Sequence, residues 1–255
     1  MIKRVKTLVK SAYERVMAVR YARRGTPRTF AGRTLRWRYA YSRFDNYEPP
    51  MYEAFVERLI PGMTVFDIGS WIGLYAVTAA AAGCDVYAFE PSPTTRGILA
   101  SHLTLNRVKA TIVPAAMSDR SGKETLYTQR ASGWESLSES AASRVQVASG
   151  DGRLEPVTVA TVTFDAFCAH SGVTPDLVKL DVEGAEMNVL AGAQAFLQRR
   201  EGTLLIEAHP SALAHFGHSI DELLGMLTGW ETTLIYQRGS DDNPDRTLHF
   251  LVTPS

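Results

Sequence analysis

Short apolar runs alternate with longer stretches of helical periodicity through the central part of the chain. The apolar runs are typical of buried strands, and they are Thr64–Phe66, Val86–Phe89, Thr111–Val113, Leu177–Leu180 and Leu204–Ile206. The stretches with apolar residues at helical spacing are Tyr52–Leu59, Leu74–Ala82, Pro93–Leu105 and Ala185–Leu197. Strands that alternate with helices predict an α/β fold, in which helices cover both faces of a mostly parallel, twisted sheet.

Two segments near the C-terminus alternate apolar and polar residues, as half-exposed strands do. Glu231–Tyr236 and Thr247–Val252 flank the turn-rich sequence Gly239–Pro244. We therefore expect an antiparallel hairpin that adds a C-terminal antiparallel strand to the sheet. Thr128–Asp151 is rich in Ser, Ala and Gly without a clear period, and its length favours a functional loop over a simple connection.

The N-terminal part of the chain is strongly basic. Residues 1–43 hold thirteen Lys and Arg against one acid, Glu14, although the whole chain has zero net charge. Apolar residues from Ile2 to Met17 recur at helical spacing. This segment is predicted to be a helix packed on its own domain or on a second subunit, a contact with a membrane surface or lipid substrate, or a disordered tail. We divide the chain into a basic extension (1–50), with Gly25–Tyr47 as a lid or dimer arm, and a main domain (51–255).

Charge and cysteine content restrict the classes of function. Beyond residue 43 there are 14 basic and 26 acidic residues, and an acidic body argues against a nucleic-acid partner. Cys84 and Cys168 form no C-x-x-C pair, which is typical of free thiols in a reducing compartment. Because no apolar run approaches the roughly 20 residues of a membrane span, we expect a cytoplasmic protein, with peripheral membrane contact through the basic N-terminus as an option.

The most informative motif is Val65-Phe66-Asp67-Ile68-Gly69-Ser70-Trp71-Ile72-Gly73. Glycines spaced G-x-x-x-G after a strand permit a sharp turn and the close approach of a ligand to the main chain. A dinucleotide fingerprint, G-x-G-x-x-G, needs glycine where Trp71 and Leu74 stand, so it is excluded. The D-x-G-x-x-x-G pattern instead resembles motif I of methyltransferases that use S-adenosylmethionine (SAM), in which the acid, here Asp67, binds the cationic end of the cofactor.

Polar residues also end the other predicted strands, where ligands of open α/β sheets bind. Glu90 follows the second strand and is expected to accept hydrogen bonds from ribose hydroxyls, with a cap for the helix opened by Pro91-Ser92-Pro93 as the alternative. Ser118-Asp119, after the third strand, faces the adenine or forms a simple turn. The predicted cofactor site comprises Asp67, Gly69, Ser70, Gly73, Glu90, Ser92, Ser118 and Asp181.

The fourth strand ends in a charged sequence, Lys179-Leu180-Asp181-Val182-Glu183-Gly184-Ala185-Glu186. Strand alternation puts Lys179, Asp181 and Glu183 on one face, and such charges are costly to bury unless they are paired or bind a ligand. Glu207 and His209 repeat this spacing on the fifth strand. One interpretation is a structural ion-pair network, and the other is a site that orients reacting groups or holds a cation.

These motifs together resemble the FkbM family of SAM-dependent methyltransferases. The matching segments follow the family's order and are Phe66–Gly73, Ala88–Pro93, Ala115–Asp119, Thr163–Asp165, Lys179–Glu186 and Ile206–His209. Ser70-Trp71 departs from the Ala-Asn usual in the family, and the large Trp71 is expected to reshape the site. The resemblance implies a class I, Rossmann-like methyltransferase fold and O-methylation of a hydroxyl on a sugar, glycan, glycolipid or other secondary metabolite.

The chemistry expected of such a site is the direct transfer of a methyl group from SAM to an oxygen. Asp67 and Ser70 are expected to bind the methionine end of the cofactor. His209 or Asp181 would accept the hydroxyl proton, and Lys179 would stabilise the developing negative charge.

Three further expectations concern activation, the acceptor and the rival functions. A divalent cation such as Mg²⁺, held by Asp181, Glu207 and His209, would also acidify the hydroxyl, although imidazole favours a softer ion. Ser132–Ser138 is the candidate loop facing the acceptor. The alternatives are methylation of nitrogen or carbon in a small molecule, and a non-catalytic SAM-binding scaffold.

Overall fold

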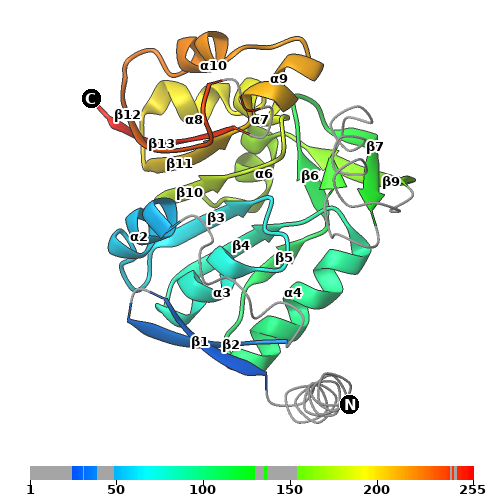
Figure 1. Cartoon of the computed structure of the whole chain (residues 1–255), viewed down its shortest axis with the longest axis vertical. Coiled ribbons are helices and arrows are strands. Elements are labelled where there is room, and N and C mark those ends of the chain that lie inside the picture. The colour runs from blue at the N-terminus through cyan, green and yellow to red at the C-terminus, as the bar shows by residue number, and fades with distance from the viewer. Residues whose placement is uncertain are drawn as a thin grey trace, which may run out of the picture.

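The computed structural model places all the predicted strands in one central sheet of seven strands (Figure 1). It describes residues 25–30, 32–38, 49–129, 135–136, 154–241, 243 and 246–255. The sheet order is β12-β13-β11-β10-β3-β4-β5. The strands are β3 (Thr64–Ile68), β4 (Asp85–Phe89), β5 (Thr111–Val113), β10 (Leu177–Leu180), β11 (Thr203–Ala208), β12 (Trp230–Arg238) and β13 (Thr247–Pro254). Neighbouring strands pair in parallel except that β13 runs antiparallel to β11 and β12, which confirms the predicted layout.

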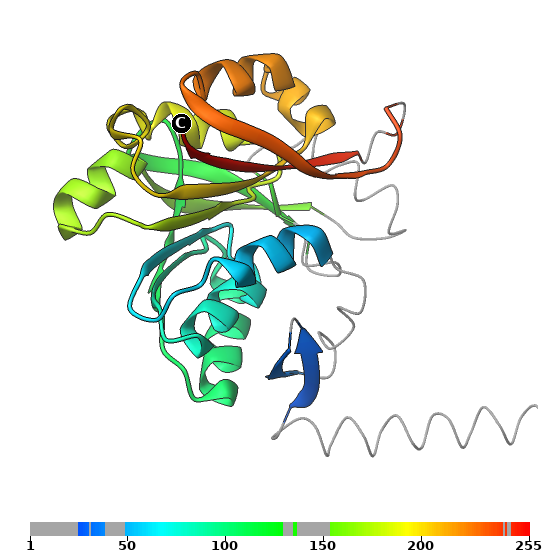
Figure 2. The ribbon, with the colours of Figure 1, turned by 90° about the vertical axis from the view of Figure 1, so that its left-hand side faces the viewer.

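Helices cover both faces of this sheet (Figure 2). The first group is α2 (Pro49–Glu57), α3 (Leu74–Ala81) and α4 (Pro93–Asn106). The second group is α6 (Phe164–Ser171), α7 (Glu186–Ala191), α8 (Gln194–Arg199), α9 (Pro210–His215) and α10 (Ile220–Met226). Alternation along β3 divides the core, because Val65 is buried with the first group whereas Phe66 and Ile68 are buried with the second.

One predicted helix, Ala185–Leu197, is two helices in the structure, α7 and α8. The break lies at Gly192, where an added Cβ would be 2.3 Å from the carbonyl oxygen of Ser118. The first amides of α8 bind a side chain of α6 instead of continuing the α7 ladder. Asp165 accepts hydrogen bonds from Ala195 N (2.7 Å) and Phe196 N (3.0 Å), so a tertiary contact caps α8.

A second sheet, of order β6-β9-β7-β8, lies beside the end of the central one and was not predicted (Figure 1). Its strands are β6 (Ala115–Met117), β7 (Gly122–Gln129), β8 (Glu135–Ser136) and β9 (Leu154–Val162). The β7–β9 pair is antiparallel. β7 includes the first two residues of the stretch Thr128–Asp151, and β9 begins after that stretch. Ser118 therefore follows β6 of the second sheet, not the strand Thr111–Val113.

A β-hairpin, β1 (Thr26–Phe30) and β2 (Arg33–Trp37), packs against α4. Leu35 and Trp37 of β2 are buried. This hairpin belongs to the segment predicted as a lid or dimer arm, and the division of the chain at residue 50 stays a prediction. The helix predicted from Ile2 to Met17 lies outside the described residues, as does the candidate acceptor loop Ser132–Ser138 apart from the backbone of β8.

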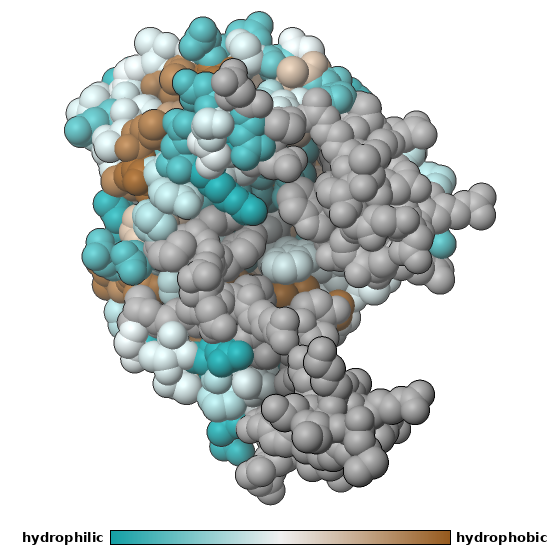
Figure 3. All heavy atoms as spheres, viewed as in Figure 1, coloured by the Kyte–Doolittle hydropathy of each residue, from teal (hydrophilic) through white to brown (hydrophobic). Residues whose placement is uncertain are grey.

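The visible surface carries no broad apolar area on the described residues of the face in Figure 3. Hydrophobic residues occur there in separate small areas between hydrophilic ones. Two large apolar side chains of the described residues are largely exposed, Ile60 and Leu234. The described helices include none with the length and hydropathy that crossing a membrane requires.

Candidate active site

The candidate site forms where four neighbouring parallel strands end. β11, β10, β3 and β4 are adjacent in the sheet, so the residues that follow them meet at one edge. Lys179 of β10 pairs in register with Asp67 of β3. Asp181 extends this ladder by one residue, since its amide donates to the carbonyl of Ile68 (3.1 Å).

The two glycines of the first turn are required by the protein itself. Gly69 has a φ of 77°, and a Cβ there would lie 1.8 Å from the carbonyl oxygen of Asp181. Gly73 has a φ of 94°, and a Cβ there would lie 2.2 Å from Leu99 Cδ1. We expected the approach of a ligand to require these glycines, but the described atoms nearest the added Cβ atoms belong to Asp181, directly after β10, and to Leu99 of α4.

A buried lysine ties this turn to the next strand. Lys179 Nζ donates to the carbonyl of Gly69 (3.0 Å) and to Asp181 Oδ2 (2.9 Å), and it lies 3.9 Å from Asp67 Oδ1. Burial by itself lowers the pKa of Lys179, but the carboxylates of Asp181 and Asp67 outweigh it, so the net pKa is raised. The lysine is therefore charged, and it neutralises part of the acidity of the site.

Asp67 points into the protein and holds the start of α3. Its Oδ2 accepts a hydrogen bond from Ala76 N (2.9 Å), and burial raises the pKa of Asp67 against the opposing effect of Lys179. Ser70 donates its hydroxyl to the backbone carbonyl of Asp67 (2.7 Å). Both side chains thus shape the turn, and their predicted contact with the methionine end of a cofactor stays a prediction.

Glu90 is a buried carboxylate that receives two backbone amides. Trp71 N donates to its Oε2 and Ser92 N donates to its Oε1, both at 2.9 Å. Its predicted contact with ribose hydroxyls stays a prediction. Ser92 is the N-cap of α4, since its hydroxyl accepts a hydrogen bond from Thr95 N. The cap predicted as the alternative role of Glu90 is therefore provided by Ser92.

Ser118 lies at the border of the two sheets and is fully buried. Its hydroxyl lies within hydrogen-bonding distance of Asp119 Oδ1 (3.2 Å) and Glu124 Oε1 (3.3 Å). These contacts hold the turn after β6, and a role at the edge of an adenine stays a prediction.

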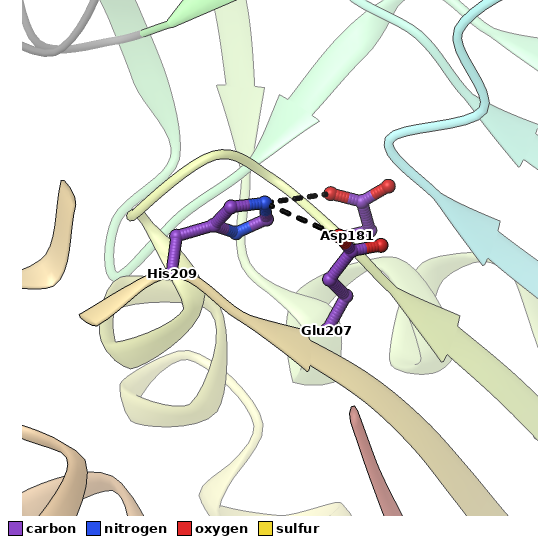
Figure 4. Close-up of side chains that lie close together, drawn as sticks. All are labelled: Asp181, Glu207 and His209. Carbon is purple, nitrogen blue, oxygen red and sulfur yellow. Dashed lines mark ion pairs between the residues drawn. The ribbon is translucent and has the colours of Figure 1, made fainter. Parts of the chain in front are cut away.

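His209 is the centre of an acidic cluster (Figure 4). Its Nε2 lies 3.4 Å from Glu183 Oε2, 3.5 Å from Glu207 Oε1 and 3.9 Å from Asp181 Oδ1. Its Nδ1 lies 3.0 Å from Glu186 Oε1. Because a carboxylate only accepts, Nδ1 carries the proton of this bond and Nε2 faces the other three acids.

The cluster favours a protonated His209. Burial lowers the pKa of His209, but the neighbouring carboxylates, Glu183 first, raise it well above its usual value. Burial raises the pKa of Glu207, yet hydrogen bonds from His209 and His249 outweigh this and hold it well below its usual range. Burial and the neighbouring acids raise the pKa of Glu183 to about 8 and also raise that of Asp181. Protons can therefore be exchanged within this cluster near neutral pH.

Sequence reasoning missed His249, and it placed Glu183 and Glu186 after the fourth strand without giving either of them a role of its own. Glu183 has a φ of 53°, so the strand alternation used for it ends before it, although its carboxylate still reaches His209. Glu186 orients the imidazole. His249, on β13, is the cross-strand partner of Glu207 and places Nε2 3.5 Å from Glu207 Oε1. A histidine between Leu248 and Phe250 was the available signal.

The cluster also contains a set of metal-type ligands, one atom each from Asp181, Glu207 and His209, all within 4.8 Å of one another. Glu207 Oε2 is buried and has no hydrogen-bond partner among the described residues. Two ligands of a common ion at about 2.1 Å each lie at most about 4.2 Å apart. The set therefore fits a small divalent cation after a slight contraction.

The fold is that of class I SAM-dependent methyltransferases. The structure is similar to a SAM-dependent methyltransferase from Agrobacterium tumefaciens, with a TM-score of 0.50 and 12% identity over 90% of this chain and 70% of that one. The chain itself belongs to the family described as the methyltransferase FkbM domain, whose model matches residues 67–234. This range contains every predicted site residue.

Two FkbM methyltransferases from other organisms have low sequence identity to this chain. The chain is 26% identical over 206 residues to the 31-O-demethyl-FK506 methyltransferase FkbM of Streptomyces tacrolimicus, covering 71% of this chain and 76% of that protein. A solved FkbM methyltransferase from Methylobacillus flagellatus KT has 15% identity and a TM-score of 0.45 over 74% of this chain. The present chain spans 43% of that longer protein.

Proposed function

We propose that the protein transfers a methyl group from SAM to a hydroxyl of a sugar, glycan, glycolipid or other secondary metabolite. The observation that carries this proposal is the His209 cluster, which sets a proton-accepting group beside the strand ends where a cofactor of this fold binds. An oxygen acceptor needs such a group because its proton must leave during transfer. The Streptomyces relative, whose name describes methylation at an oxygen, supports the same class of acceptor.

When bound, SAM supplies an electrophilic methyl group and leaves as S-adenosylhomocysteine. The residues of this chain then have distinct roles. Glu90 would accept hydrogen bonds from the ribose hydroxyls, and the turn held by Asp67 and Ser70 would seat the methionine end. Asp181 would accept the hydroxyl proton as the new C–O bond forms, or His209 Nε2 would do so after passing its own proton to a neighbouring carboxylate. Lys179, bonded to Asp181, would stabilise the negative charge that develops there.

The test compares the proposed base with a histidine outside the site. His209→Gln is expected to lower kcat by roughly 10²- to 10⁴-fold, the usual contribution of general-base catalysis, and to leave the affinity for S-adenosylhomocysteine unchanged. Asp181→Asn is expected to lower kcat as well. The matched control is His215→Gln at the exposed end of α9. The Nδ1 of this histidine contacts the carbonyl oxygen of Ser211. Near-normal turnover in both site variants would refute this assignment.

A divalent cation is the second candidate for activating the hydroxyl. The buried, unpartnered Oε2 of Glu207 and the mixed carboxylate and imidazole ligand set favour it. The cation would take the place of the proton on His209 Nε2. Turnover that falls after treatment with a chelator and returns with Mn²⁺ or Mg²⁺ is the expected result. Unchanged turnover after chelation would contradict the cation and leave His209 as the base.

The rival functions give different results in the same assays. An amine acceptor needs less help from a base, so a nitrogen methyltransferase would keep most of its rate in His209→Gln. A non-catalytic scaffold would bind S-adenosylhomocysteine and would methylate none of a panel of sugar, glycolipid and polyketide hydroxyls. The cluster around His209 supports the oxygen acceptor, because a hydroxyl must lose its proton during transfer and the cluster contains groups that can accept one.

A further inference from the structure

His102 of α4 lies between the N-terminal hairpin and the glycine turn of the candidate cofactor site. It is fully buried. Its Nε2 lies 3.2 Å from Arg38 N, at the end of β2, and its Nδ1 lies 2.8 Å from the carbonyl oxygen of Ile72. One side chain thus contacts two segments that are more than thirty positions apart in the sequence.

The two partners fix the protonation of this imidazole. The backbone amide of Arg38 can only donate, so Nε2 accepts, and the carbonyl of Ile72 can only accept, so Nδ1 carries the hydrogen. A neutral ring satisfies both bonds at once. In agreement with this, burial lowers the pKa of His102, against the opposing effect of the bond to Ile72.

The hairpin is fastened to α4 around this residue. Asn106, one helical turn after His102, accepts a hydrogen bond from Arg36 N (2.7 Å) and donates one to Arg36 O (2.8 Å). The buried ring of Trp37 meets the His102 ring edge-on, with 5.0 Å between centroids. The hairpin and His102 therefore form one contact surface on α4.

The other end of the connection reaches the ribose carboxylate of the proposed site. Ile72 follows Trp71, whose amide donates to Glu90, and precedes Gly73. Trp71 has a φ of 49°, a left-handed conformation that is strained for a residue with a side chain. Such a turn keeps its shape only where its neighbours hold it, and the bond from His102 holds the next carbonyl.

We propose that His102 is a positioning residue for cofactor binding, through which the hairpin β1–β2 holds the glycine turn in its binding conformation. The inference rests on the proposed SAM site at this turn and at Glu90. It assigns to the hairpin a part in cofactor affinity that acts through α4, against which the hairpin packs.

The experiment is a double-mutant cycle on S-adenosylhomocysteine affinity, measured by calorimetry, with thermal unfolding recorded for each variant. Asn106→Ala loosens the hairpin without removing a contact to the turn. We expect it to weaken binding by roughly 3- to 10-fold, the effect of a hydrogen bond or two. His102→Ala should weaken binding at least as much. Adding Asn106→Ala to His102→Ala should then have little further effect, because the connection is already broken.

Conservative variants separate positioning from folding. His102→Asn places an amide N–H near the position of Nδ1, so it should keep the bond to Ile72 and retain more affinity than His102→Ala. His102→Gln places its amide nearer the position of Nε2, so it should lose the bond to Ile72 and should not retain this affinity. Thr104→Ala is the matched control on the same helix, since the hydroxyl of Thr104 bonds to Ala100 O within α4 itself.

Each result decides between the two proposals. If the unaltered protein binds S-adenosylhomocysteine and Asn106→Ala binds it equally well, the coupling is wrong and the proposed function stands. Fully additive losses in the double variant would also overturn the coupling. If the unaltered protein binds none, the proposed cofactor site is wrong, and the coupling falls with it. Should His102→Ala not fold, Asn106→Ala and the two conservative variants still decide the question.

Discussion

Replacing Gly69 with alanine tests how the glycine turn is joined to β10. The new Cβ would lie 1.8 Å from the carbonyl oxygen of Asp181 and 2.9 Å from its carbonyl carbon. These are backbone atoms of a buried strand end, so they cannot move aside as a flexible side chain does. Any shift of Asp181 also disturbs Lys179, which bonds to both Gly69 and Asp181.

The magnitude follows from comparison with Gly83→Ala. Gly83 also has a positive φ, 89°, but the nearest atom to its added Cβ is Pro61 Cβ at 3.5 Å, an ordinary contact. Both variants bear the strain of a left-handed residue, roughly 1–2 kcal/mol. Only Gly69→Ala adds a backbone clash inside the core, which brings its expected loss of unfolding free energy to about 3–5 kcal/mol.

The assay is thermal unfolding of the two variants and the unaltered protein, followed by circular dichroism. For a chain of this size the midpoint of thermal unfolding falls by roughly 2–4 °C per kcal/mol, so the two variants should be well separated. Gly69→Ala should also lose affinity for S-adenosylhomocysteine, whereas Gly83→Ala should keep it. Equal destabilisation by both substitutions would refute the close approach of Asp181 as the reason for glycine at position 69.

Three further perturbations have defined outcomes. Glu186→Gln removes a carboxylate that raises the pKa of His209, so His209 becomes neutral at lower pH. The rising limb of kcat against pH should therefore move to lower pH. An unmoved limb would exclude His209 as the titrating group. Burial raises the pKa of Cys168 to about 11, so at pH 8 it should react with iodoacetamide about a hundredfold more slowly than in urea, and equal rates would contradict its burial. Asp165→Ala leaves two amides of α8 without their acceptor and should cost about 1–2 kcal/mol of unfolding free energy, whereas an unchanged urea midpoint would show that α8 is capped otherwise.

The central sheet and the position of the site could be predicted from the sequence for a physical reason. Parallel strands buried on both faces give continuous apolar runs, and a polar residue directly after such a run, as at Asp67, Glu90 or Asp181, marks the strand end. The spacing of Glu207 and His209 placed them beside Asp181 in the same way. The structure brings these three residues together in one ion-pair network.

Other features depend on contacts that the sequence does not display. The break between α7 and α8 needs the carbonyl of Ser118 and the side chain of Asp165. The pairing of β7 with β9 joins segments separated by a stretch without a period. The role of His249 follows from the register of β13 on β11, which sets it opposite Glu207.

Side-chain directions were the least predictable part of the site. Asp67 and Ser92 were expected to face a cofactor. In the structure they accept hydrogen bonds from the amides of Ala76 and Thr95, at the starts of α3 and α4. Both helices begin with amides that need acceptors, and these requirements compete with ligand binding. The contact of the basic N-terminus with a membrane stays a prediction, and so does the formation of a homodimer.

A crystal structure with S-adenosylhomocysteine would test the proposed cofactor site directly. We predict one bound molecule at the ends of β3, β4 and β10, with both ribose hydroxyls on Glu90 and the sulfur on the side of Asp181 and His209. A ligand bound elsewhere, or a ribose that does not contact Glu90, would contradict this prediction.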